Sequence, residues 1–541
     1  MPEFSIARDI EESDQNVVKI HNYPVPTDGV NLNASLVELA ETECIQSKNC
    51  VVRNGWVKRG GTAKYVAAEV VSDKAILGLH KFYYNPNASQ LLVVCDTIAK
   101  RLDGTSWTNI KTGLTTAKST RICTWGPLQK AYFANGHDIP HKWDGSSSSA
   151  VSGTHYPTKA IQFLPYRDRL LHIDANKPGY LGWSKSFTDT SWESITNIGV
   201  RPDSQLYGMM LHANANVNAG EQAKVLLAGA DGMHLFSGEL LGPPFVVGNY
   251  RVDSLAIMVG CNAPRSMVWT PAGSMWLGLD REVYLLPFNS NVPVPMGTAI
   301  RSLHHTLSGI ESIPKAQIQN ACAVYHDGFY KLAFASSGQT TNDTQFWLDI
   351  TRLHQNKAQL WGPWYGPMKG METAMFANFA GPGDAEELLY GEHNATTGGF
   401  VHQTAQSGIY TDNDVNIDVI IQTYFNPCGD PSFMKNVERM EAEMLNTTGD
   451  ISLELHDIDG LYKRNLKFIE NNTLLKWGDE AAIWNTFYWQ SNKPTRREVQ
   501  VPPPARMRRV SVIVKQNIGT DKFELYSFKA KVHSDDVAFD T

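Results

Sequence analysis

The stretch KAYFANGHDIPHKWDG, residues 130–145, contains the turn signals from which the fold can be predicted. Its apolar segment is followed by Asn135-Gly136, and a second short segment ends at Asp144-Gly145. Asn-Gly and Asp-Gly steps between apolar segments are typical of antiparallel β-hairpins. Upstream, QLLVVCDTIAKRLDGTSWTNI (90–110) has the same layout, and its Asp103-Gly104 step lies 41 residues before Asp144-Gly145. A repeat of about 40 residues built from short strands is typical of β-propeller blades.

Similar units continue along the chain. Trp143 and Trp183 repeat the spacing at 40 residues, and weaker copies follow as far as ELLYGEHNATTGGFVHQ (387–403). Each unit opens with a short apolar segment; these segments are AILGLHKFYY (75–84), TRICTWG (120–126), AIQFLPY (160–166), YGMMLHA (207–213), APRSMVW (263–269), NACAVYH (320–326) and TAMFANF (373–379). Their number predicts an all-β fold with a propeller of about seven blades over residues 66–412.

The chain changes character after residue 412. From VNIDVIIQTYFNP (415–427) to FELYSFKAKV (523–532), apolar and polar residues alternate, a period of two that is typical of half-buried strands. We therefore expect a C-terminal β-sandwich over residues 413–541 that folds on its own. Residues 1–65 are predicted to be an N-terminal extension and lead-in strand, with one short helix at LVELAETECIQ (36–46).

The opening stretch holds four residues that raise the question of a metal or acid/base site: His137, Asp138, His141 and Asp144. In a blade, the two histidines straddle a turn and the strand that follows it. Side chains in polar hairpins commonly bond to their own backbone. We interpret the group as structural, with a metal site as the alternative.

Bulk composition narrows the function classes. The 541 residues are 42% hydrophobic, enough for the cores of two or more domains. With 48 Lys and Arg against 55 Asp and Glu, the net charge is −7, so contact with DNA must be local or weak. The N-terminus lacks a signal-peptide pattern, and no apolar run approaches the roughly 20 residues of a membrane span. Seven scattered cysteines without a C-x-x-C pair indicate reduced thiols in a cytoplasm-like compartment.

Catalytic motifs are weak. DGTSW (103–107) and FTDTSWESI (187–195) contain residues of the sialidase repeat S-x-D-x-G-x-T-W, but without its spacing. The sequence has no Walker-type loop, G-x-S-x-G elbow or H-E-x-x-H motif, and His304-His305 has no further ligand spacing. We interpret His304-His305 as strand residues and expect no enzymatic activity, metal or cofactor. A pair of glycosidase carboxylates among the acidic residues stays open as an alternative.

One segment is strongly basic, although the chain as a whole has a negative net charge. KPTRREVQVPPPARMRR (493–509) holds six basic residues against one acidic residue. A solvated loop and strand edge is one interpretation, since arginine and proline discourage edge pairing. The other is a docking surface for an acidic neighbour or for DNA phosphates. Its candidate residues are Lys493, Arg496, Arg497, Arg506, Arg508 and Arg509.

Residues 50–65, CVVRNGWVKRGGTAKY, lie at the start of the repeats. This stretch resembles the one that opens many tail proteins of tailed phages, although Gly60 stands where that family usually has proline. The succession from RPDSQLYGMM (201–210) through VGCNAPRSMVW (259–269) to AIRSLHHTLSG (299–309) is similar in layout to the packaged-DNA stabilisation, or tail nozzle, proteins of short-tailed phages. The C-terminal sandwich is similar in placement.

The resemblance implies a structural virion protein: a nozzle, or head-to-tail connector, subunit in a ring of six copies around the DNA exit channel. Such a ring retains packaged DNA and guides its ejection. The implied neighbours are adaptor and portal-side connector proteins, tail fibre or tail needle proteins, and genomic DNA that passes without sequence-specific binding. The implied location is the virion tail, assembled in the host cytoplasm. The alternative is a phage baseplate or adhesin propeller that binds host surface glycan through tryptophan and tyrosine rings.

Overall fold

The structure, a computed structural model, divides the chain into two compact units, residues 60–415 and a second unit made of residues 1–59 with 416–541. It describes residues 19–534 except 86–87, 194–197, 201–202, 213–223, 239–249, 289, 303–308, 357–358, 380–386, 395–397, 405–408, 430–433, 447–450, 460–462, 469–494, 503–505 and 517–521.

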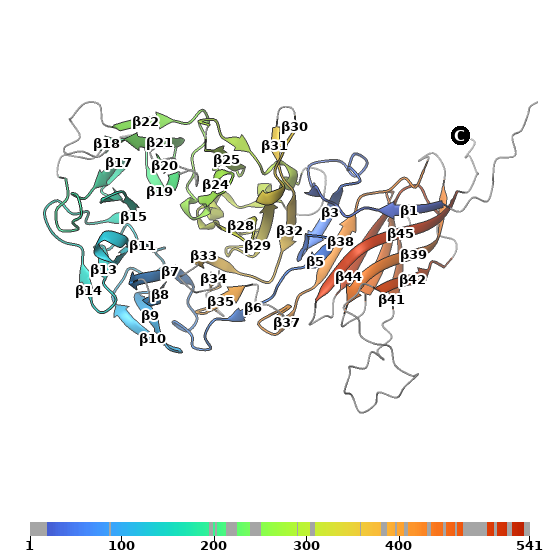
Figure 1. The fold of residues 1–541 in the computed structure, drawn as a ribbon, viewed down its shortest axis with the longest axis horizontal. Helices are drawn as coiled ribbons and strands as arrows, with labels where there is room; N and C mark the ends of the chain where they lie inside the picture. Colours follow the sequence, from blue (N-terminus) through green and yellow to red (C-terminus); the bar gives the residue numbers. More distant parts are fainter. Residues whose placement is uncertain are drawn as a thin grey trace, which may run out of the picture. The chain divides into compact units, whose positions relative to one another are not determined.

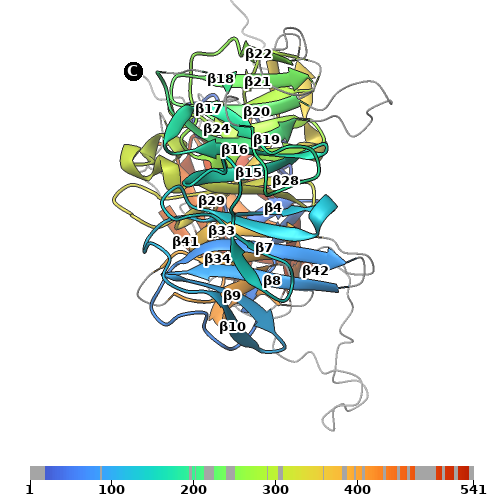
Figure 2. The same cartoon turned by 90° about the vertical axis from the view of Figure 1, so that its left-hand side faces the viewer.

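Residues 60–415 form a β-propeller, as predicted. Five of its blades are separate four-stranded antiparallel sheets, and two more are four-stranded stretches of larger sheets, which makes seven. Figures 1 and 2 show the strands of a blade side by side, most clearly β7 to β10.

The first four blades, in chain order, are β7 to β10 (Ile76–Asn85, Ala88–Cys95, Ile98–Asp103, Ser106–Lys111), β11 to β14 (Arg121–Trp125, Lys130–Ala134, His141–Trp143, Ser148–Ala150), β15 to β18 (Ala160–Tyr166, Arg169–Asp174, Lys177–Trp183, Ile198–Gly199) and β19 to β22 (Leu206–His212, Lys224–Gly229, Met233–Gly238, Tyr250–Ser254). The last three are β23 to β26 (Val268–Thr270, Gly273–Leu277, Val283–Pro287, Val294–Pro295), then β27, β28, β29 and β32 (Cys322–His326, Phe329–Phe334, Thr344–Asp349, Trp364–Met368), and finally β33, β34, β35 and β6 (Thr373–Phe379, Glu387–Glu392, Val401–Thr404, Thr62–Lys64).

The blades close into a ring. The first strand of each blade contacts the first strand of the next, and β33 of the last blade contacts β7 of the first. These strands therefore lie around the central channel. The fourth strand of the last blade, β6, comes from the beginning of the unit, and its Lys64 pairs with His402 of β35. The propeller thus begins at residue 60, not 66, because a segment that we expected to be a lead-in strand completes the ring.

Apolar side chains of neighbouring blades pack on one another and fill the space between them. Phe82 and Leu92 of the first blade form one core with Phe133 and Trp143 of the second. The Asp-Gly steps that revealed the repeat lie in the turns between the third and fourth strands of their blades, where Gly104 and Gly145 have φ of +61° and +98°. Glycine adopts this left-handed region without steric cost, which explains why the motif recurs.

Shorter elements complete the described part of this unit. They are a hairpin of β30 (His354–Asn356) and β31 (Gln359–Trp361), the short strands β36 (Thr411–Asp412) and β37 (Val415–Asn416), and six 3-10 helices at Gly126–Leu128, Pro264–Ser266 (η2), Thr298–Ile300, Ile310–Ser312, Lys315–Asn320 and Ile350–Arg352. Among the described residues, no helix is long and apolar enough to cross a membrane.

The second unit contains two mainly antiparallel sheets. One runs in the order β4 (Cys50–Val52), β5 (Trp56–Lys58), β45 (Phe523–Ser534), β39 (Lys435–Asn446) and β42 (Thr495–Gln500), with β1 (Lys19–Tyr23) on β45 and β43 (Arg506–Met507) on β39. The other runs in the order β2 (Gly29–Val30), β3 (Glu43–Lys48), β38 (Val419–Thr423), β44 (Val510–Gln516), β40 (Ile451–Asp457) and β41 (Lys463–Phe468).

This arrangement corrects the predicted boundaries. Residues 19–59 do not form a separate extension, because β1 to β5 supply strands to both sheets of the unit that residues 416–534 complete. The predicted helix at 36–46 is wrong as well. Turns occupy its first half, and β3 begins at Glu43, with Cys44 and Ile45 buried. The predicted alternation is present in β40, where every second side chain is buried, and the face-to-face sandwich stays a prediction.

Candidate functional site

The basic segment is divided among several elements of the second unit. Arg496 and Arg497 lie on β42, Arg506 lies on β43, and Arg508 and Arg509 lead into β44. Lys493 lies outside the described residues. Both β42 and β43 pair with β39, at opposite ends of that strand. The structure therefore does not bring the described arginines into one cluster.

Carboxylates neutralise the β42 part of this segment. Arg496 Nη2 lies 2.5 Å from Glu441 Oε2 and 3.3 Å from Glu498 Oε1. Arg439, on the neighbouring strand, contacts the same two carboxylates at 2.6 and 3.2 Å. The hydrogen bond that Arg496 donates to Glu441, followed by the negative charge of Glu441, raises the pKa of Arg496. This ladder of alternating charges fits a solvated strand face better than a surface for phosphates.

The loop before β44 is held mainly through its backbone. The amides of Arg508 and Arg509 donate to Asp457 Oδ1 at 3.2 and 3.3 Å, and the Arg509 guanidinium donates to the Val37 carbonyl at 3.2 Å. Arg506 and Arg508 are exposed. Of the predicted docking residues that the structure describes, these two remain the best placed to meet an acidic partner.

Hydrogen bonds and packing hold the residues of the group His137, Asp138, His141 and Asp144 in place. Asp138 accepts hydrogen bonds from the backbone and hydroxyl of Thr115 at 2.8 and 2.6 Å and from the Asn135 amide at 2.6 Å. His141 is buried and stacked on Phe133, with ring centroids 4.3 Å apart, and burial lowers its pKa to about 4. These contacts give Asp138 and His141 structural roles.

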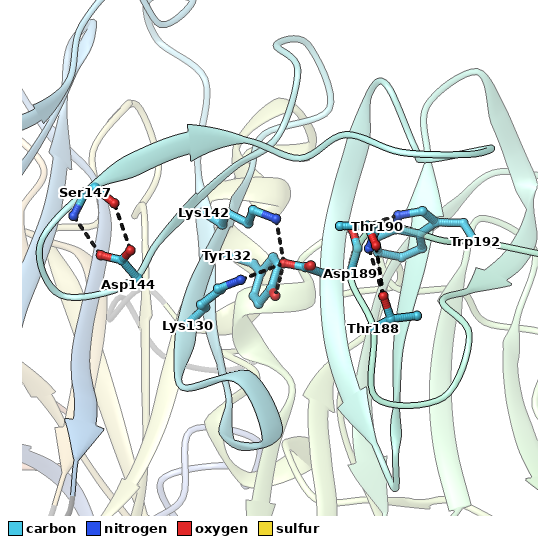
Figure 3. Close-up of polar contacts among 9 residues, drawn as sticks. All are labelled: Lys130, Tyr132, Lys142, Asp144, Ser147, Thr188, Asp189, Thr190 and Trp192. Atoms are coloured by element: carbon cyan, nitrogen blue, oxygen red, sulfur yellow. Dashed lines mark hydrogen bonds and ion pairs between the residues drawn. The ribbon is translucent and has the colours of Figure 1, made fainter.

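Asp144 caps the next turn. Its carboxylate accepts hydrogen bonds from the backbone and hydroxyl groups of Ser146 at 2.8 Å. It accepts two more from the backbone and hydroxyl of Ser147 at 2.7 and 2.8 Å (Figure 3). Among the described residues, no three His, Cys, Asp or Glu side chains come together in a way that could hold a metal ion. His304-His305 lies outside those residues. All seven cysteines are free thiols in the structure.

A cluster of charged contacts in the propeller is centred on Asp189, in the FTDTSW segment after β17. Its Oδ2 lies 2.7 Å from Lys142 Nζ and 3.3 Å from Lys130 Nζ, and accepts a 2.8 Å hydrogen bond from the Tyr132 hydroxyl (Figure 3). All three partners lie on β12 and β13 of the second blade, whereas Asp189 belongs to the third. The contact therefore ties two neighbouring blades together.

The electrostatics of this Asp189 cluster favour a fixed ion pair. Burial opposes ionisation of the carboxyl, but hydrogen bonds from Lys142 and Tyr132 and the charges of both lysines outweigh it, so the pKa of Asp189 is lowered. Burial and the neighbouring carboxylate raise the pKa of Tyr132. With 5% of its side chain exposed and three donors on one oxygen, Asp189 is poorly placed to act as a general base. Sequence reasoning noted FTDTSW only as an incomplete sialidase repeat and missed this contact.

The solved structures named below resemble this chain only distantly. No protein-family model and no curated protein matches the chain. The solved structure of Saccharomyces cerevisiae Sqt1 is 8% identical with a TM-score of 0.38, covering 67% of this chain and 99% of its own. The WD40 β-propeller domain of Doa1 is 10% identical with a TM-score of 0.36, covering 64% and 98%. BBS1N, solved in complex with ARL6DN, is 11% identical with a TM-score of 0.38, covering 68% and 100%. Similarity at this level carries no argument about function.

Proposed function

We propose that this chain is a structural subunit of a phage tail nozzle that assembles with copies of itself into a ring around the DNA exit channel. The observation that carries the proposal is the position of residues 50–65, the stretch that resembles the opening of phage tail proteins. It contains β4, β5 and β6, so it runs from the second unit into the strand that completes the propeller.

The closed propeller suits a role as a rigid building block. Its backbone enters and leaves at one place, since the Gly61 amide donates to the Ile409 carbonyl at 2.8 Å and β6 pairs with β35. Blades packed in a closed ring have short, protected edges, while the loops between strands are free to meet neighbours. A stable ring needs repeated interfaces that each bury about 1,000 Å² or more.

The charge distribution supports passage of DNA rather than tight binding. Tight binding requires many lysines and arginines on phosphates, whereas this chain has a net charge of −7 and pairs Arg496 with carboxylates. Arg506 and Arg508, both exposed, then serve as docking residues for an acidic neighbouring tail protein.

The test is a phage that lacks the gene for this chain. We expect its heads to fill with DNA and then to leak it, measured as loss of nuclease-resistant DNA over time. Purified protein added to such heads should restore a tail stub in electron micrographs, and the protein alone should form closed rings in negative stain. Mutant heads that retain DNA stably and fail only to adsorb to cells would argue against the nozzle role.

One observation favours the second candidate function, binding of host surface glycan. Trp269, the middle residue of β23, is 36% exposed, and its ring lies 6.1 Å from that of Phe288. Exposed aromatic faces of this kind can stack against sugar rings. If the glycan-binding role is correct, Trp269→Ala should abolish adsorption of the phage to its host without any loss of packaged DNA.

A further inference from the structure

The central channel of the propeller contains two arginines that the proposed function does not use. Arg121 is the first residue of β11, and Arg265 lies in η2, just before β23. Both lie where the first strands of the blades meet around the channel.

The hydrogen bonds of these two arginines connect different blades. Arg121 Nη1 donates to Gln162 Oε1 on β15. Gln162 is held in turn by β19, since its Oε1 accepts from the Met209 amide at 2.9 Å and its Nε2 donates to the Met209 carbonyl at 2.8 Å. Arg265 Nη1 donates to the Ala374 carbonyl on β33 at 3.0 Å.

The Arg121 side chain reaches well beyond the neighbouring blade. A Cβ added to Gly208 of the fourth blade would lie 2.6 Å from Arg121 Nη1 and 2.4 Å from Pro264 Cβ. Arg121 of the second blade and Pro264, which precedes Arg265, therefore converge on one glycine. Arg265 thus follows a residue that lies against the same glycine as Arg121, and its charge is close enough to act on Arg121.

Neither cation has an opposite charge beside it. Among the residues that the structure describes, no carboxylate lies within ion-pair distance of Arg121 or Arg265, although the propeller pairs Lys142 with Asp189 and Arg301 with Glu282. A guanidinium carries five N–H donors, and each of these groups has one protein acceptor. Burial, followed by the charge of Arg265, lowers the pKa of Arg121 to about 9.

We infer that this end of the channel is a binding site for a small oxyanion of the phosphate class, held between Arg121 and Arg265. The planar fork of each guanidinium matches two oxygens of a tetrahedral oxyanion. Gln162 positions the Arg121 guanidinium through its hydrogen bond, and Gly208, which has no side chain, leaves the space that this guanidinium occupies. The anion would join the second and fifth blades across the channel. This inference does not depend on the nozzle proposal.

The experiment measures thermal unfolding and calorimetric binding of the full chain with inorganic phosphate, at constant ionic strength set with chloride. We expect Tm to rise with phosphate concentration. Arg121→Gln and Arg265→Gln should each weaken phosphate binding at least tenfold, because each removes one charge-assisted fork. Without phosphate, either variant should have a Tm equal to or above wild type, since it relieves repulsion between two like charges. Arg251→Gln is the matched control, because Arg251 is 77% exposed and already paired with Asp253.

Three outcomes would overturn the inference. The first is a wild-type Tm that does not respond to phosphate, and the second is a response that both glutamine variants retain. The third is a lowered Tm of Arg121→Gln in phosphate-free buffer together with no phosphate binding to wild type, which would show that Arg121 only braces the blades. If Arg121→Gln does not fold, Arg121→Lys keeps the charge without the fork and should still bind phosphate more weakly than wild type.

Discussion

Replacing Asp189 by alanine should loosen the second blade from the third. The change leaves Lys142, whose side chain is 12% exposed, and the Tyr132 hydroxyl without their shared acceptor. A hydrogen bond to a charged group contributes about 1.5–3 kcal/mol, and the longer, 3.3 Å ion pair with the partly exposed Lys130 adds at most about 1 kcal/mol. The three contacts share one oxygen, so their contributions do not add in full. We therefore expect the free energy of unfolding of the propeller to fall by about 3 kcal/mol.

Differential scanning calorimetry of the full chain measures this loss. An unfolding entropy of about 2.1 cal/mol/K per residue, over a unit of roughly 350 residues, converts a loss of about 3 kcal/mol into a Tm lowered by about 4 °C. Asp103→Ala is the matched control, since the Asp103 side chain is 62% exposed and lies 3.5 Å from Arg101. Its Tm should change by less than about 1 °C.

The pH dependence gives a second check on Asp189. Because its folded-state pKa is lowered, its stabilisation is fully present above the unfolded pKa of about 3.9 and disappears as pH falls through the folded pKa. The Tm difference between wild type and Asp189→Ala should be constant above about pH 5 and shrink toward about pH 3. A Tm difference below about 1 °C at neutral pH would show that Asp189 does not hold the two blades together. So would a difference that acid leaves unchanged while both proteins stay folded.

Four other outcomes are expected. Gly153→Ala should destabilise the propeller by about 3 kcal/mol or more, measured by calorimetry, because φ is +123° and the new Cβ would lie 1.8 Å from the Thr190 carbonyl oxygen. His141→Phe should reduce the loss of stability on acidification from about pH 6.5 to pH 4, because the buried imidazole stays neutral in the folded protein, where its pKa is lowered, and gains its proton on unfolding. Metal analysis of the purified protein should also find no stoichiometric zinc. Alkylation under denaturing, non-reducing conditions should modify seven cysteines by intact mass, whereas the native protein should react slowly because six of the thiols are buried. A fragment of residues 413–541 should be unfolded by circular dichroism, and co-expression with residues 1–59 should restore its sheets, since both segments supply their strands.

The sequence predicted the features that local chemistry determines. Asp-Gly turns and a tryptophan on the third strand repeat at blade spacing, so the propeller and its first strands could be found from Gly104, Gly145, Trp143 and Trp183. Pairing between strands that lie far apart in the sequence produces no such repeat. Trp56 pairs with Leu525, and nothing in either segment identifies the other as its partner.

The candidate site was harder to predict for the same reason. The basic character of residues 493–509 is visible in the sequence, whereas its neutralisation by Glu441 depends on a strand more than 50 residues away. Asp189 and its lysines, and likewise Arg121 and Arg265, meet only because the blades close into a ring. A single side chain in such a contact carries no sequence pattern, since the neighbours that define its role come from other blades.

The split second unit sets an order of events during synthesis. β5 leaves the ribosome early, but its partner β45 follows about 465 residues later, a delay of roughly 25–90 s at about 5–20 residues per second. The complete propeller is made in that interval, and its own last blade waits for β35 to meet β6. Throughout, β1 and β5 lack β45, the partner that they share, and unpaired strand edges are prone to aggregation. A cell that translates this chain slowly, or has few free chaperones, should therefore lose more of it before the last residues are made.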